Sequence, residues 1–170
     1  MKKILLLMLI CLLLTGCGMK VSPPAESPVT ELTPTVPPAN SYEEETIPQL
    51  LTFTVYTGND NADGFLTTQV EVTEINEGIV LEKLKEAGVI PETVEIIAIT
   101  SEGSQLNIDM NKAFYDHLCT MGTSGEMILV GSVVNTFLNA YQAETIFLTC
   151  EGEIMESGHV VYDFPLGLFE

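Results

Sequence analysis

Apolar and polar residues alternate along two segments near the start of the region that we expect to fold. Residues 51–57 place Phe53 and Val55 on one face, and residues 66–75 alternate in the same way, so each segment predicts a strand. Residues 59–64 between them have the composition of a turn. We therefore expect the two strands to form a hairpin or to lie close together.

A helix and two more strands are predicted next. Asn76 is expected to be the N-cap of a helix that ends at Gly88, because a short polar side chain favours the first position and glycine favours the position after the last turn. Beyond Pro91, residues 94–100 and 105–110 are strand candidates. The polar residues between these two segments predict a hairpin loop.

Two further helices are predicted in the second half of the chain. Residues 112–118 predict a short helix behind Asn111. Thr123 and Glu126 fit a capping box, in which the hydroxyl accepts from the backbone amide three residues later and the carboxylate reaches back. Apolar residues at i, i+3 and i+4 spacing over 130–141 predict that the helix behind this box is the longest one.

The chain closes with a strand at 145–150 and a last strand candidate at 159–164. Strands clustered around two or three helices predict an α+β fold. We expect a single mixed or antiparallel sheet of about four to six strands, packed on two to three helices that cover one face.

The amino end has the pattern of a lipoprotein signal peptide. Two lysines precede an apolar run at 4–14, which is shorter than the ~20 residues needed to span a bilayer and typical of a secretory signal. Leu14-Thr15-Gly16-Cys17 resembles the bacterial lipobox, which implies that residues 1–16 are removed and that Cys17 carries a diacylglyceryl thioether. An ordinary signal peptide with a chance cysteine and an uncleaved anchor are the alternatives.

A proline-rich linker is predicted between this anchor and the folded region. Residues 17–48 hold seven of the nine prolines, among Ser, Thr, Glu, Val and Ala. Such a segment buries too little apolar surface to offset its ordering entropy, and it favours extended conformations. We expect a lipidated Cys17 followed by a disordered linker up to residue 48, and one globular domain at 49–170.

The net charge of the chain restricts the classes of partner that it can bind. Six basic residues stand against 24 acidic ones, which gives a formal net charge of −18. Nucleic acid is excluded as a partner, because phosphate binding needs clustered Lys and Arg. Adsorption to an anionic membrane through a basic patch is excluded for the same reason. The expected contact with the membrane is therefore the lipid on Cys17.

Three groups of residues have side chains that could serve in metal binding or catalysis. Residues 59–64 superficially fit a calcium loop, but Asn59 stands where the first Asp belongs and Val70 where the bidentate Glu belongs. The second group is Glu153, Glu156 and His159, for which a solvated loop is expected. The third group is Asp116, His117 and Cys119, in which adjacent residues of the predicted helix do not face one another and so do not form a catalytic pair. We expect no catalytic residue, no metal ligand and no cofactor.

Cys119 and Cys150 are the two thiols of the expected domain. An extracytoplasmic location permits a disulfide between them. Cys150 also fits a buried apolar position on the 145–150 strand, where it would stay reduced. Both alternatives remain open.

The order of these segments resembles the GerM-type sporulation and spore-germination (GerMN) domain. The resemblance covers about 51–166, with a single copy where some members have two, and with Met110 where the family often has a small aliphatic residue. The segments that carry it are Phe53-Thr-Val-Tyr56, Val89-Ile-Pro91, Leu106-Asn-Ile-Asp-Met-Asn-Lys-Ala-Phe114, Val133-Val-Asn-Thr-Phe137, Thr145-Ile-Phe-Leu-Thr-Cys-Glu-Gly152 and Phe164-Pro-Leu166.

This resemblance implies a fold similar to the ring-building modules of secretion and sporulation complexes. It also implies a non-enzymatic, membrane-anchored module on the extracytoplasmic face of a Gram-positive-type cell membrane. Its expected role is in sporulation, germination or envelope assembly, through a protein partner or peptidoglycan. The alternative is an envelope lipoprotein that binds a small ligand or a cation, which predicts a concave pocket with convergent polar groups.

Overall fold

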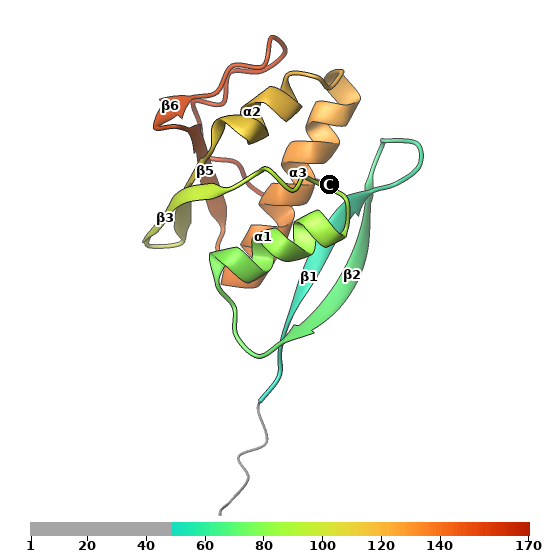
Figure 1. Cartoon of the computed structure of the whole chain (residues 1–170), viewed down its shortest axis with the longest axis vertical. Coiled ribbons are helices and arrows are strands. Elements are labelled where there is room, and N and C mark those ends of the chain that lie inside the picture. The colour runs from blue at the N-terminus through green and yellow to red at the C-terminus, as the bar shows by residue number, and fades with distance from the viewer. Residues whose placement is uncertain (1–48) are drawn as a thin grey trace, which may run out of the picture. The chain divides into compact units, whose positions relative to one another are not determined.

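The computed structural model of this chain describes residues 49–170 (Figure 1). The predicted signal peptide, Cys17 and the linker at 17–48 lie outside the described residues. The described part is an α+β structure of three helices and six strands. The elements are β1 (Leu51–Gly58), β2 (Phe65–Val72), α1 (Glu77–Glu86), β3 (Ile96–Glu102), β4 (Gln105–Met110), α2 (Lys112–Leu118), α3 (Thr123–Tyr141), β5 (Thr145–Cys150) and β6 (Glu153–Ile154).

The strands form two sheets, so the prediction of a single sheet was wrong. β1 and β2 make an antiparallel hairpin, as predicted, and they form a sheet of their own. The second sheet has the order β3-β4-β5-β6, in which β4 and β5 are parallel and the other pairs antiparallel. The crossover from β4 to β5 contains α2 and α3, as a parallel connection requires.

Helix α3 separates the two sheets and explains why they do not merge (Figure 1). It packs against β1 on one side and β5 on another. The backbone amides on the free edge of β1 donate to side chains of α3: Thr54 N to Asn139 Oδ1 at 2.6 Å, and Tyr56 N to Thr136 Oγ1 at 3.0 Å. A helix therefore covers this edge of β1, and the backbone amides of Thr54 and Tyr56 have partners without a neighbouring strand.

Most of α3 is buried, rather than the single apolar stripe that its sequence predicts. Phe137, Val130 and Val134 belong to the hydrophobic core together with residues of both sheets and α1. The polar Asn135 and Thr136 are also fully buried, and both have backbone partners. A helix buried on several sides is expected where it lies between two layers.

The helix ends agree with the sequence in two cases and differ in one. Asn76 caps α1 through a hydrogen bond from Ile79 N at 2.9 Å, and Gly88 follows the helix at φ +71°, both as predicted. The capping box was wrong: Gly122 is the N-cap of α3, and Thr123 is already helical. Asn111 directly precedes α2, as predicted; its side-chain nitrogen donates to Thr93 O, and its side-chain oxygen accepts no capping bond.

Two strand predictions also need correction. The strand predicted at 94–100 runs from Ile96 to Glu102, with an irregularity between Ile96 and Ala98. Residues 159–164 form no continuous strand; Val161 makes only an isolated bridge to Glu156. A second bridge, Ile146 to Leu166, fastens the carboxyl-terminal segment to β5.

Candidate functional site

The residues 59–64 form the hairpin turn between β1 and β2. Asn59 Nδ2 donates to Asp63 Oδ1 at 2.7 Å, and Asp63 N donates to Asn59 Oδ1 at 3.1 Å. The backbone amide of Asn59 also donates to Gly64 O. These oxygens hold the turn together, which is the role that the sequence favoured over calcium binding.

Glu153, Glu156 and His159 do not share a helix face in the structure. Glu153 lies in β6, Glu156 lies at an isolated bridge, and His159 is exposed in the loop that follows. Within residues 49–170, no three His, Cys, Asp or Glu side chains lie close enough together to hold a metal ion.

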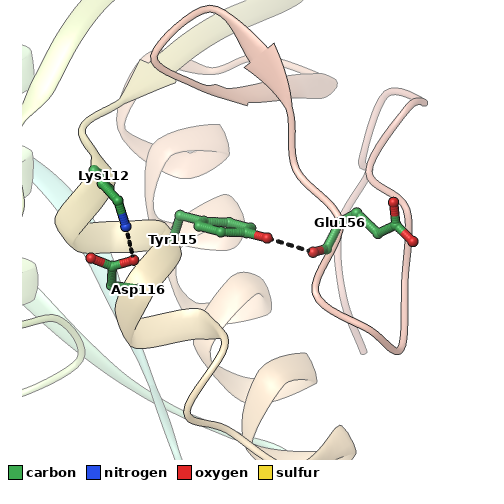
Figure 2. Close-up of polar contacts among 4 residues, drawn as sticks. All are labelled: Lys112, Tyr115, Asp116 and Glu156. Carbon is green, nitrogen blue, oxygen red and sulfur yellow. Dashed lines mark hydrogen bonds and ion pairs between the residues drawn. The ribbon is translucent and has the colours of Figure 1, made fainter.

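Side chains of α2 make structural contacts at the positions considered for catalysis (Figure 2). Asp116 pairs with Lys112 one turn earlier, and this hydrogen bond raises the pKa of Lys112. The Tyr115 hydroxyl donates to the backbone carbonyl of Glu156 at 2.9 Å, and so fastens the loop after β6 to α2. Figure 2 shows the Glu156 carboxylate on the far side of this bond, away from Tyr115.

The thiols Cys119 and Cys150 are both free, so the structure contains no disulfide between them. Cys119 is exposed at the end of α2. Cys150 is partly buried, and burial raises the pKa of its thiol. A raised pKa keeps the thiol protonated at neutral pH, and the protonated form is a weak nucleophile.

The sequence reading missed the most unusual polar group of the described residues, the carboxylate of Glu126. Glu126 lies in the first turn of α3 and is only 2% exposed. Its Oε1 accepts from the Tyr162 hydroxyl at 2.6 Å and from Ser157 Oγ at 2.5 Å. Its Oε2 is buried and has no hydrogen-bond partner in the described part of the chain.

The carboxyl-terminal segment and the start of α3 enclose a cavity of about 230 Å³ beside this carboxylate. Burial and the hydrogen bond to Glu126 raise the pKa of Tyr162 well above its ordinary value, so the phenol stays a donor. Two exposed apolar side chains, Met127 and Phe164, contribute to the lining. The lining residues are Thr123, Glu126, Met127, Val160, Tyr162, Phe164, Leu166 and Phe169.

The described part of the chain is strongly acidic. Residues 49–170 hold three lysines against nineteen Asp and Glu, a formal charge of −16. Lys83 and Lys112 already pair with Glu86 and Asp116. Such a surface favours a partner with a basic face.

Residues 24–156 match a family described as Germane: sporulation and spore germination. The chain belongs to the Germane family. This confirms the GerMN resemblance inferred from the sequence, and the match begins within the predicted linker and ends at Glu156. The segment after Glu156, which carries Tyr162 and Phe164, lies beyond the match.

Two solved structures are similar to this Germane chain. One, from Clostridium perfringens, is described as a lipoprotein; it is 14% identical, with a TM-score of 0.43, and the alignment covers 69% of this chain and 87% of that one. The other contains the tandem GerMN domains of the sporulation protein GerM from Bacillus subtilis, at 12% identity and a TM-score of 0.49. That alignment covers 71% of this chain and 45% of the tandem chain, so this chain spans under half of it. No curated protein sequence matches significantly.

None of the helices described for this Germane chain is long and apolar enough to cross a membrane. The features that the family match does not assign are the buried Glu126 and the cavity beside it. The acidic residue was visible in the sequence, but the capping-box pattern gave it a local role. Only the fold brings Tyr162 and Ser157 to it, from positions more than thirty residues away.

Proposed function

We propose that this Germane chain is a lipid-anchored, non-catalytic module on the extracytoplasmic face of a Gram-positive-type cell membrane. It acts in sporulation, spore germination or envelope assembly, by associating with a protein partner or with peptidoglycan. The observation that carries the proposal is the Germane match over residues 24–156. The lipobox-like segment ending at Cys17 supports the anchor.

A non-catalytic role is supported by the bonding of the candidate groups. Asp116 is engaged with Lys112, and the Cys150 thiol has a raised pKa. Catalysis needs a nucleophile, a base and a stabilising group held in reach of one another. The acidic surface supports association with a basic partner, because complementary charge speeds encounter and selects among partners.

The anchor is tested by Cys17→Ala in the native bacterium, with membrane fractionation and metabolic labelling by an alkyne fatty acid. We expect loss of the label, because the acyl chains are attached through the Cys17 thiol, and a change in how the protein fractionates, because two acyl chains give stable attachment. Cys11→Ala is the matched control: it removes a thiol from the apolar run and should leave labelling and fractionation unchanged. Fatty-acid labelling of Cys17→Ala at the wild-type level would refute the lipid anchor.

The cellular role is tested by deleting the gene and measuring spore yield and germination. Restoration by the wild-type chain, and not by Cys17→Ala, is the expected result. Normal sporulation, germination and envelope integrity in the deletion strain would count against the proposed role.

A further inference from the structure

The cavity beside Glu126 has the make-up of a side-chain binding pocket. Its volume of about 230 Å³ is below the ~300–1,000 Å³ typical of drug-sized ligands. Apolar groups form most of its walls, among them Val160, Leu166 and Phe169. A cavity of this size and composition fits an extended side chain with an aliphatic stem.

The carboxylate that lines the cavity is only half satisfied. Both bonds from Tyr162 and Ser157 go to Oε1, and Oε2 has no partner in residues 49–170. Neither of the two ion pairs formed by the described residues involves Glu126. A buried carboxylate without a compensating charge is unfavourable, and a cation brought to Oε2 would relieve it.

We infer that this cavity binds the lysine side chain of a basic protein partner, with the ammonium on Glu126 and the aliphatic stem against Phe164 and Met127. The ammonium is favoured over a guanidinium because only one oxygen is free. A guanidinium binds carboxylates through two parallel bonds that use both oxygens, whereas an ammonium is a compact point charge.

Entry of the lysine requires a movement of the rim, because Oε2 is closed to water in the unliganded state. Met127 is 41% exposed and lines the cavity. Methionine is unbranched, with three rotatable bonds, so it adapts to a new neighbour at low cost. Displacement of the Met127 side chain is the movement that we assign to ligand entry.

The rim favours a protein as the source of the ammonium. Phe164 is 48% exposed and Met127 is 41% exposed, and both line the cavity. Exposed apolar side chains around a pocket match the apolar core of a protein interface better than a polar wall peptide. The choice of a protein as the partner rests on the proposed function, association with a partner in the cell envelope. The binding of an amine in the cavity does not depend on that function.

The first test is a titration of the full chain in detergent, with the methionine methyl groups labelled and the Met127 resonance followed by NMR. The probes are n-butylammonium, n-butanol as its neutral analogue and n-propylguanidinium. We expect a saturable shift with n-butylammonium and binding at least about tenfold weaker for the other two, since hydrogen bonds to charged groups contribute ~1.5–3 kcal/mol. Equal binding of n-butanol would overturn the assignment.

Variants separate this site from the acidic surface. Glu126→Gln should weaken n-butylammonium binding by about tenfold or more, whereas Glu102→Gln, the same change at an exposed position of β3, should leave it unchanged. Phe164→Ala changes an exposed rim residue and should also weaken binding, with Ile97→Ala as its exposed apolar control. Weaker binding in Glu102→Gln would contradict the site, and so would unchanged binding in Phe164→Ala.

The source of the amine is tested by competition. A peptide with one lysine between apolar residues is compared with its Nε-acetylated form and with a muropeptide that carries a free diamino-acid amine. Tighter binding of the unmodified peptide supports the proposal, and tighter binding of the muropeptide overturns the choice of a protein. Because the butylammonium titration needs neither the lipid nor a cellular partner, failure of the anchoring or sporulation tests leaves its result unaffected.

Discussion

Gly131, in the middle of α3, provides a sharp test of how this helix fits between the two sheets. A Cβ atom at this position would lie 2.4 Å from Phe65 Cζ and 3.0 Å from Phe169 Cγ. Phe65 begins β2, and Phe169 lies in the terminal segment, so the β1-β2 hairpin and the terminal segment both approach the same backbone position of α3. Glycine occupies this position although it is a poor helix former.

The substitution Gly131→Ala brings two opposing effects. Alanine in a helix interior gains about 1 kcal/mol over glycine, while overpacking a core costs about 1–3 kcal/mol. The Phe169 ring cannot retreat easily, because the Phe169 backbone makes two hydrogen bonds with Asn135. We therefore expect a net loss of up to about 2 kcal/mol in the free energy of unfolding, with Tm falling by roughly 3–6 °C for each kcal/mol lost.

Gly125→Ala in the same helix is the matched control. Its Cβ would meet only the Met121 side chain, with Sδ at 3.3 Å, and a methionine can turn aside. This variant should be as stable as the wild type or more stable by up to ~1 kcal/mol. The assay is urea unfolding of each full chain, followed by far-UV circular dichroism.

A double-mutant cycle identifies the cause of the loss. Leucine at position 65 lacks the ring atom nearest to the new methyl group, so Gly131→Ala should cost about 1 kcal/mol less in a Phe65→Leu background. Equal stabilities for Gly131→Ala and Gly125→Ala would refute the close approach of Phe65 and Phe169 to α3.

Two further predictions concern the terminal segment. Asn135→Ala removes both hydrogen bonds to the Phe169 backbone, at 2.8 and 2.9 Å, and should lower the free energy of unfolding by about 2–3 kcal/mol. In a chain lacking residues 169–170, the same substitution should cost under ~1 kcal/mol. An equal cost in the two chains would contradict the role of these bonds. The raised pKa of Tyr162 predicts that the urea midpoint falls as pH rises above about 10, because the unfolded phenol then releases a proton that the folded one retains. Tyr162→Phe should make this fall shallower, and an unchanged slope from pH 9 to 11 would show that Tyr162 does not cause it.

Local patterns in the sequence predicted most elements, because their causes are local. Asn76 and Gly88 bound α1 through bonds and dihedral angles within a few residues. Alternation predicted β1 and β2, because successive side chains of a strand point to opposite faces. The strand expected at 159–164 did not form, because no strand pairs along it and Val161 makes only an isolated bridge to the nearby Glu156.

The candidate site was not predictable in the same way. Glu126 stands three residues after Thr123, which is the spacing of a capping box, and nothing nearby in the sequence indicates a buried carboxylate. Its partners Ser157 and Tyr162 come from the terminal segment, which the bridge between Ile146 and Leu166 holds against β5. Spacing in the sequence indicates which residues are neighbours along the chain, whereas burial depends on contacts between residues far apart in the sequence.

The sequence by itself determined the acidity, the lipobox-like segment, the ordered helices and strands, and the family resemblance, since these depend on composition and on short-range periodicity. The tertiary structure alone decided that the strands form two sheets. The sequence of an edge strand does not indicate whether another strand or a helix will cover that edge. Here the side chains of Thr136 and Asn139 of α3 accept hydrogen bonds from backbone amides of β1. It also decided that the carboxylate of Glu126 lies beside an apolar cavity with one oxygen unpaired, because that arrangement exists only once α3 and the terminal segment pack together.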